Sequence, residues 1–141
     1  MKSDTAVVCS NYDGLSLSVL VTQPEEGGRG VVQISHGMAE YKERYLPFME
    51  YLAKCGYASV IHDHRGHGKS VKSQEDLGYF YEGGEKAVVE DLHQITVWAK
   101  ERFPGEKFYM VGHSMGSLAA RMYLKKYDFE LDKLVLTGPP C

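Results

Sequence analysis

Residues 108–124 read FYMVGHSMGSLAARMYL and contain the pentapeptide GHSMG at 112–116. This is a G-x-S-x-G pattern, in which Ser114 stands two residues from a glycine on either side. An apolar run precedes the pattern, and four residues recur after it at helical spacing: Met115, Leu118, Ala119 and Met122. The stretch therefore predicts a buried strand, a tight turn at Ser114 and a helix.

A serine in such a turn has two interpretations. As a nucleophile, Ser114 would take a strained backbone conformation, and the positions of Gly112 and Gly116 must then lack side chains. The free N–H groups and dipole of the following helix would favour the negative charge that develops during attack. Alternatively, Ser114 is an ordinary N-cap that follows a buried strand. Because the bare pattern also arises by chance, the rest of the chain has to decide.

Working outward, strands and helices alternate along the chain. The expected elements are hairpin strands at 5–10 and 15–24, strands at 30–37, 57–63, 107–114 and 132–140, and helices at 44–55 and 88–99 with one after Ser114. The helix at 88–99 carries Val88, Leu92, Ile95 and Ala99 on one face. This order predicts an α/β protein with a mostly parallel sheet, helices on both faces and an antiparallel hairpin at its start. Ligands bind at the carboxyl ends of such strands, where loops begin at His36, Asp63 and Ser114.

The loop SHGMAE at 35–40 is a candidate for the second half of an acyl-transfer site. Such a site needs N–H donors for the oxyanion, one of them from the residue after the nucleophile, here Met115. A second donor comes from a loop after an earlier strand, and His36-Gly37 followed by the Met38 N–H fits that place. Taken alone, His-Gly after a strand predicts only a turn.

The loop HDHRGHGKS at 62–70 holds three histidines and an aspartate, so a metal site is one interpretation. The carboxylate lies between His62 and His64 rather than in a known metal motif, which favours no metal. The structural alternative is a tight turn in which Asp63 and Arg65 form an ion pair.

Four motifs occur in order along the chain: HGMAEYKERY, DHRGHGKS, VVEDLHQ and GHSMGS. Together they resemble the α/β-hydrolase fold, and within it the monoacylglycerol lipase and lysophospholipase branch of the S33-type serine hydrolases. The resemblance implies that Ser114 is the nucleophile and that Met38 and Met115 supply the oxyanion N–H groups. It implies cleavage of lipid esters through an acyl-enzyme, with no metal and no organic cofactor. Tyr41 stands where many relatives carry histidine, and we expect it to tune the pocket.

Composition excludes several classes of protein. The chain has 141 residues, a net charge of −3 and no run of basic residues, which argues against a nucleic-acid partner. No segment resembles a signal peptide or reaches the length of a membrane span. The three cysteines are odd in number and lack metal-type spacing, so a reducing cytoplasmic setting is expected.

The catalytic partners of Ser114 are not evident on this chain. In this fold an acid and then a histidine follow the serine, yet all six histidines precede Ser114. We therefore expect residues 1–141 to be the N-terminal part of one α/β-hydrolase domain, without its cap, last strands and triad Asp and His. Such a chain should be weakly active at most, and its strand at 132–140 should be an exposed edge prone to self-association. A small-ester esterase, a peptidase and a non-catalytic binding module remain alternatives.

Overall fold

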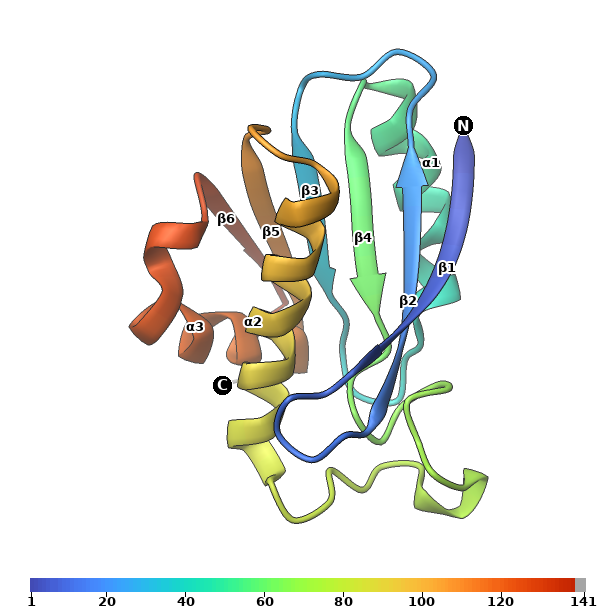
Figure 1. Ribbon diagram of the computed structural model, residues 1–141, viewed down its shortest axis with the longest axis vertical. Coiled ribbons are helices and arrows are strands. Elements are labelled where there is room, and N and C mark those ends of the chain that lie inside the picture. The colour runs from blue at the N-terminus through green and yellow to red at the C-terminus, as the bar shows by residue number, and fades with distance from the viewer. Residues whose placement is uncertain (139–141) are drawn as a thin grey trace.

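The computed structural model describes residues 1–138 and consists of a six-stranded sheet with helices on both faces (Figure 1). The strands are β1 Lys2–Cys9, β2 Ser16–Gln23, β3 Val31–Ser35, β4 Ala58–His62, β5 Phe108–His113 and β6 Lys133–Thr137. The helices are α1 Leu46–Lys54, α2 Gly84–Arg102 and α3 Met115–Tyr127, with short 3-10 turns η1 Lys42–Tyr45, η2 Gln74–Asp76 and η3 Asp128–Glu130. The predicted α/β class is confirmed.

The strand order is β1-β2-β4-β3-β5-β6. β1 and β2 form the expected antiparallel hairpin, and β2 also pairs antiparallel with β4. The pairs β3–β4, β3–β5 and β5–β6 are parallel, so the loops after β3, β4 and β5 emerge at one edge of the sheet. Every residue of β3 and β4 is buried, as continuous apolar strands covered on both faces should be.

Two layers of side chains fill the space between sheet and helices. On the α1 face, Met49 packs with Val32 and Ile34 of β3. On the opposite face, the predicted stripe of α2 is buried at all four positions: Val88, Leu92, Ile95 and Ala99. The predicted helix at 44–55 instead divides into η1 and α1, whose first turn contains Pro47. Proline suits the start of a helix because its missing N–H would lack an intrahelical partner there.

The predicted apolar face of α3 is wrong. Leu118 and Met122 are each 38% exposed, and of the four expected residues only Ala119 is buried. The buried face consists of Gly116, Ser117, Ala119, Ala120 and Tyr123. The helix lies so close to β3 that a Cβ at position 116 would overlap the carbonyl oxygen of Ser35. Small residues therefore face the sheet, and the larger apolar ones turn outward.

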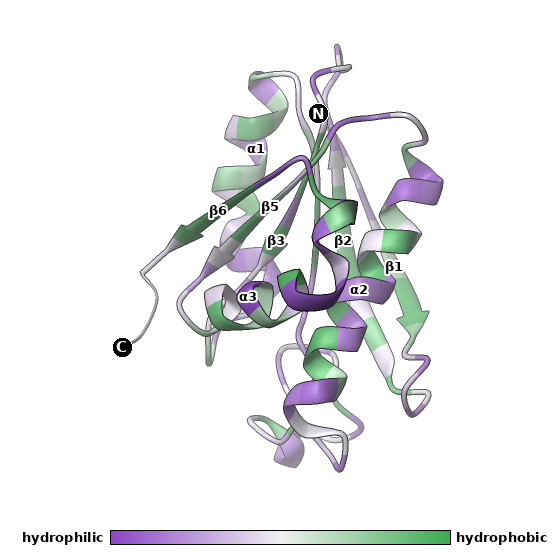
Figure 2. Cartoon of the chain, turned by 90° about the vertical axis from the view of Figure 1, so that its left-hand side faces the viewer, coloured by the Kyte–Doolittle hydropathy of each residue, from purple (hydrophilic) through white to green (hydrophobic). Residues whose placement is uncertain are grey.

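Strand β6 lies at one edge of the sheet, and among the described residues it pairs only with β5. Its central residue Val135 is 53% exposed, and Figure 2 shows hydrophobic residues along this outermost strand. The expected edge is thus present over Lys133–Thr137. Asp132 and Gly138 lie just outside the strand, and the last two residues of the prediction, Pro139 and Pro140, lie outside the described residues, as does Cys141.

Candidate active site

Ser114 occupies the tight turn between β5 and α3 with φ 54° and ψ −120°. Non-glycine residues rarely have a positive φ, and the neighbouring structure must hold them in it. A Cβ at Gly112 would stand 2.8 Å from the carbonyl oxygen of Gly116, and one at Gly116 would overlap the carbonyl oxygens of Ser35 and His36. The strained serine and the two obligatory glycines agree with the predicted turn.

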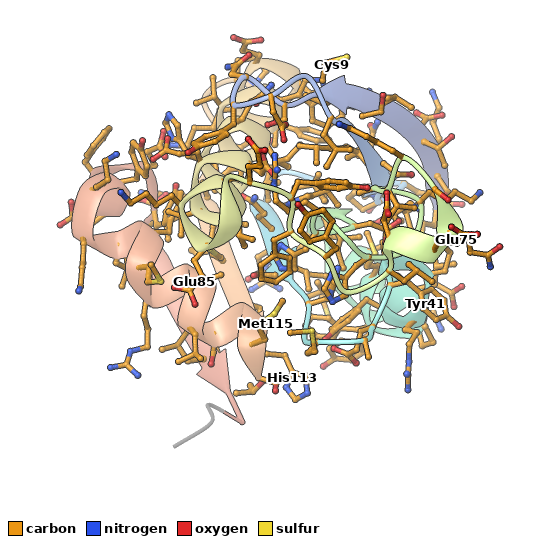
Figure 3. All side chains as sticks on the ribbon, turned by 90° about the horizontal axis from the view of Figure 1, so that it is seen from below. Cys9, Tyr41, Glu75, Glu85, His113 and Met115 are labelled. Carbon is orange, nitrogen blue, oxygen red and sulfur yellow. The ribbon has the colours of Figure 1, made fainter. Side chains whose placement is uncertain are left out.

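The side chain of Ser114 does not cap α3, so the N-cap interpretation is wrong. Instead, the Ser114 carbonyl oxygen accepts hydrogen bonds from the N–H of Ser117 at 2.9 Å and from its hydroxyl at 2.6 Å. His113 turns away, as expected, and its Nδ1 lies 2.9 Å from the Thr137 hydroxyl (Figure 3). Ser114 is partly exposed, and its hydroxyl has no hydrogen-bond partner between residues 1 and 138.

The loop after β3 lies directly against this turn. A Cβ at Gly37 would be 3.2 Å from the Cβ of Ser114, so only glycine permits this approach. The Gly37 N–H donates to Glu40 Oε1 at 2.7 Å. The N–H groups of Met38 and Met115 donate to no acceptor within the described part of the chain, which leaves both available to a ligand. Figure 3 shows Met115 and His113 at the same end of the molecule as Tyr41 on the facing loop.

His36 joins the loops after β3 and β4. Its Nδ1 lies 2.7 Å from the Gly37 carbonyl oxygen, and its Nε2 accepts the N–H of His64 at 3.0 Å. The ring must carry its proton on Nδ1 to make both bonds, so it is neutral. Burial lowers the pKa of His36 to about 4 and keeps it neutral near pH 7.

Asp63 anchors the loop after β4, although not through the expected partner. Its carboxylate accepts from the Lys42 N–H at 2.7 Å, from Lys42 Nζ at 2.9 Å and from the Lys69 N–H at 2.9 Å. The predicted ion pair between Asp63 and Arg65 is wrong, because each residue pairs with a different element. Lys42 was missed, since nothing in the sequence distinguishes it from a surface lysine.

Arg65 forms the second buried ion-pair system. It is fully buried and donates from Nε to Asp91 Oδ2 at 2.7 Å and from Nη1 to Asp13 Oδ2 at 2.8 Å. Burial raises the pKa of Asp91, although the hydrogen bond from Arg65 opposes that shift. The sequence held a signal for Asp91, because it falls on the apolar face of α2 between Val88 and Ile95.

Four imidazoles gather beneath these loops. The ring centroids of His36 lie 4.4 Å from His64 and 5.3 Å from His67, and those of His62 and His64 lie 5.1 Å apart. Burial lowers the pKa of His62 to about 3 and that of His64 well below its usual value. Within residues 1–138, no group of three or more His, Cys, Asp or Glu has the geometry of a metal site. We assign the cluster a packing role.

An apolar groove of about 450 Å³ adjoins the turn, lined by Met38, Phe80, Val88, Met115, Leu118 and Met122 among others. A second cavity of about 360 Å³ is also lined by Met38, with Tyr41, His67 and Leu77 in its walls. Met38 thus borders both cavities. Leu118 and Met122 of α3 face outward and line the first groove. The predicted helix face would place both side chains in the core.

The model of one protein family, serine aminopeptidase S33, matches residues 27–141. The chain belongs to this hydrolase family. A monoacylglycerol lipase from Mycolicibacterium smegmatis is 32% identical over 129 residues, covering 89% of the chain and 43% of that protein. A human monoglyceride lipase is 27% identical over 136 residues, covering 92% of the chain and 41% of that protein.

Solved structures of a carboxyl esterase and a monoglyceride lipase have the same architecture. A thermostable carboxyl esterase from Bacillus coagulans superimposes with a TM-score of 0.86 at 29% identity, over 96% of the chain and 44% of the esterase. A soluble variant of monoglyceride lipase from Saccharomyces cerevisiae superimposes with a TM-score of 0.79 at 25% identity, over 99% of the chain and 45% of the lipase. The fold is that of the α/β hydrolases, and the chain spans less than half the length of these relatives. Over residues 1–138, no helix is long and apolar enough to cross a membrane.

Proposed function

We propose that Ser114 is the nucleophile of a serine carboxylic-ester hydrolase of the monoacylglycerol lipase and lysophospholipase type. One observation carries the proposal: a strained, partly exposed serine has a free hydroxyl at the start of α3, with the Gly37–Met38 loop packed against it. The N–H groups of Met115 and Met38 would receive the oxyanion. Each such donor contributes about 3 to 4 kcal/mol to transition-state stabilisation.

In the proposed reaction, Ser114 Oγ attacks the ester carbonyl carbon and its proton passes to a general base. The C–O bond to the alcohol then breaks, the alcohol leaves with that proton, and the acyl group stays on Ser114 as an ester. Water attacks this acyl-enzyme and releases the acid, which regenerates the hydroxyl. The backbone donors hold the negatively charged oxygen in both steps.

The general base is not among the histidines of this chain. Both nitrogens of His36 are engaged, and His113 contacts Thr137 on β6. His62 and His64 are fully buried and His67 is nearly so, while His93 Nδ1 lies 2.9 Å from Glu130 Oε1. We propose that residues 1–141 form part of one α/β-hydrolase domain and that the triad acid and histidine are supplied from outside these residues. Alone, the chain should hydrolyse esters weakly at most, because triad members act as a unit.

A lipid ester is the proposed substrate. The apolar groove beside Met38 and Met115 suits an acyl chain, and the named lipase relatives act on such molecules by their descriptions. A small-ester esterase is the alternative favoured by the carboxyl esterase structure, and a peptidase is the one favoured by the family description. A non-catalytic binding module is the alternative from another class.

Two measurements test the proposal. In the product of the complete gene, a fluorophosphonate probe should label Ser114 and should not label the Ser114→Ala variant; a wild-type protein that resists the probe would indicate a pseudoenzyme. For residues 1–141 alone, we expect almost no turnover of a short p-nitrophenyl ester. A brisk rate that disappears in Ser114→Ala would refute the proposal that the base lies elsewhere.

Self-association through β6 is a separate proposal. The backbone of Lys133–Thr137 is unpaired on one side within the described residues, and an open strand edge attracts another strand. Size-exclusion chromatography of residues 1–141 should therefore give species larger than a monomer, and a stable monomer would contradict this. The cytoplasmic setting stays a prediction, supported by the free thiols of Cys9 and Cys55.

A further inference from the structure

The carboxylate of Glu40 is the one charged group that contacts the backbone of the loop beside Ser114 within residues 1–138. We propose that Glu40 is a positioning residue, which holds the Gly37–Met38 peptide in the orientation that an oxyanion donor at Met38 requires. The inference rests on the function proposed above and adds a residue to that site. Hydrogen bonds hold both peptide planes that flank the Gly37 Cα.

Hydrogen bonds fix the Gly37–Met38 peptide from the side opposite its N–H. The Gly37 carbonyl oxygen accepts from His36 Nδ1 at 2.7 Å and from the Glu40 N–H at 3.3 Å. In a trans peptide the carbonyl oxygen and the following N–H point in opposite directions. Because the Gly37 oxygen points toward the His36 ring and the Glu40 N–H, the N–H of Met38 points away from them.

Glu40 fixes the preceding peptide plane. Its Oε1 accepts the Gly37 N–H at 2.7 Å, so the amides on both sides of the Gly37 Cα are constrained. The same hydrogen bond occupies the Gly37 N–H and leaves Met38 as the free donor of the pair. Ala39, the next residue, has φ 60°, which is unfavourable for a residue with a side chain and needs external support.

Tyr45 fixes Glu40 in turn. Its hydroxyl donates to the same Oε1 at 2.8 Å, from η1 just before α1. Burial raises the pKa of Glu40, while the hydrogen bonds from Tyr45 and Gly37 lower it, and the pKa ends below its usual value. The carboxylate is therefore ionised near neutral pH and is held at one oxygen by two donors.

Reach, rather than charge, is what this arrangement needs from residue 40. A negative charge near the oxyanion would destabilise the oxyanion. The Glu40 carboxylate is nevertheless close to the site: a Cβ built on Gly37 would lie 2.8 Å from Glu40 Oε1, and the same Cβ would approach Ser114. Glutamine has the same length and an acceptor oxygen without the charge, whereas aspartate keeps the charge and is one methylene shorter. The two substitutions separate positioning from electrostatics.

The first experiment measures amide exchange by NMR in the product of the complete gene without substrate, so it needs no catalysis. Relative to the wild type, Glu40→Ala and Glu40→Asp should accelerate exchange of the Gly37 amide by about tenfold or more. Glu40→Gln should keep it within about threefold, and Tyr45→Phe should fall between. Glu50→Gln, at an exposed carboxylate of α1, is the matched control and should change nothing.

The second experiment measures ester hydrolysis by the product of the complete gene. Glu40→Ala and Glu40→Asp should lower kcat by about 10- to 100-fold with little change in KM, and Glu40→Gln should retain most of kcat. Thermal unfolding midpoints identify any variant that fails to fold. If Glu40→Ala or Glu40→Asp fails, the kcat values of Glu40→Gln and Tyr45→Phe test the positioning role instead.

The outcomes separate the two proposals. An unchanged Gly37 amide in Glu40→Ala, or rescue by Asp but not by Gln, would overturn the positioning role. Absence of Ser114-dependent turnover in the wild type would refute the proposed function instead, while the exchange result would still decide what Glu40 does.

Discussion

The loops that follow β4 and β5 are both rich in polar residues, and the structure gives them opposite environments. After β4, the side chains of Asp63, His64 and Arg65 are fully buried and bonded into the protein. After β5, Ser114 is partly exposed, and its hydroxyl has no hydrogen-bond partner among the residues that the structure describes. The first loop is stabilised by its polar groups, whereas the second holds a strained residue with a free reactive group.

This difference suggests a structural role for the loop after β4 and a chemical role for the turn at Ser114. The histidine-rich motif is the more conspicuous of the two in the sequence, yet its groups face each other or the protein interior. The G-x-S-x-G motif is less specific, yet its serine is partly exposed, with a hydroxyl that has no hydrogen-bond partner within residues 1–138. Exposure, which composition does not reveal, distinguishes the two, because buried ring nitrogens of His62, His64 and His67 also have no hydrogen-bond partner among the described residues.

The largest expected effect is acid unfolding caused by the buried histidines. Their pKa values are about 4 for His36, about 3 for His62 and well below normal for His64. Between pH 6.5 and 4 the unfolded chain therefore binds up to three more protons than the native chain. The contribution of these neutral histidines to the free energy of unfolding is fully present above pH 6.5. Below pH 6.5 the free energy of unfolding should fall by up to about 4 kcal/mol per pH unit.

Urea unfolding between pH 7 and pH 4.5 measures this slope. In His62→Leu, which removes one of the three titrating rings, the slope should fall by about a third. A flat dependence of the free energy of unfolding over this range would show that the imidazoles are not buried in their neutral forms.

The next effect concerns the ion pairs of the β4 loop. Arg65→Ala leaves the carboxylate of Asp91 buried without its partner, which should cost about 3 to 5 kcal/mol in the free energy of unfolding. Arg102→Ala breaks the more exposed pair with Asp4 and should cost about 1 kcal/mol or less. Urea denaturation at pH 7 compares them, and equal losses would contradict the assignment of Arg65 to structural support.

The smallest effect should have the opposite sign. Ser114→Gly relieves the strain of φ 54° and should stabilise the fold by about 1 kcal/mol, while removing any activity. Gly116→Ala is the contrasting variant and should destabilise, because its Cβ overlaps backbone of β3. A Ser114→Gly protein less stable than the wild type would mean that the serine side chain supports the turn after all.

Most of the fold could be predicted from the sequence, because burial on both faces makes β3 and β4 mostly apolar, interrupted between their end residues only by Gln33 and Ser59. The face of α3 could not, since its close approach to β3 selects small residues that carry no hydrophobic signal. Asp63 and Arg65 were recognised as charged anchors, but their partners Lys42 and Asp91 depend on how distant segments meet. Glu40 was missed for a different reason: its partners Gly37 and Tyr45 are close in the sequence, but the direction of a side chain within a loop is not encoded in a residue pattern.

The central claim is that the chemistry belongs to Ser114 and that the histidine-rich loop supports it. Rapid quenching of the complete gene product with p-nitrophenyl acetate, followed by peptide mass spectrometry, tests this most directly. The account predicts one acetyl group on the peptide that contains Ser114, absent in Ser114→Ala. Acetylation of another residue with turnover retained in Ser114→Ala would contradict it.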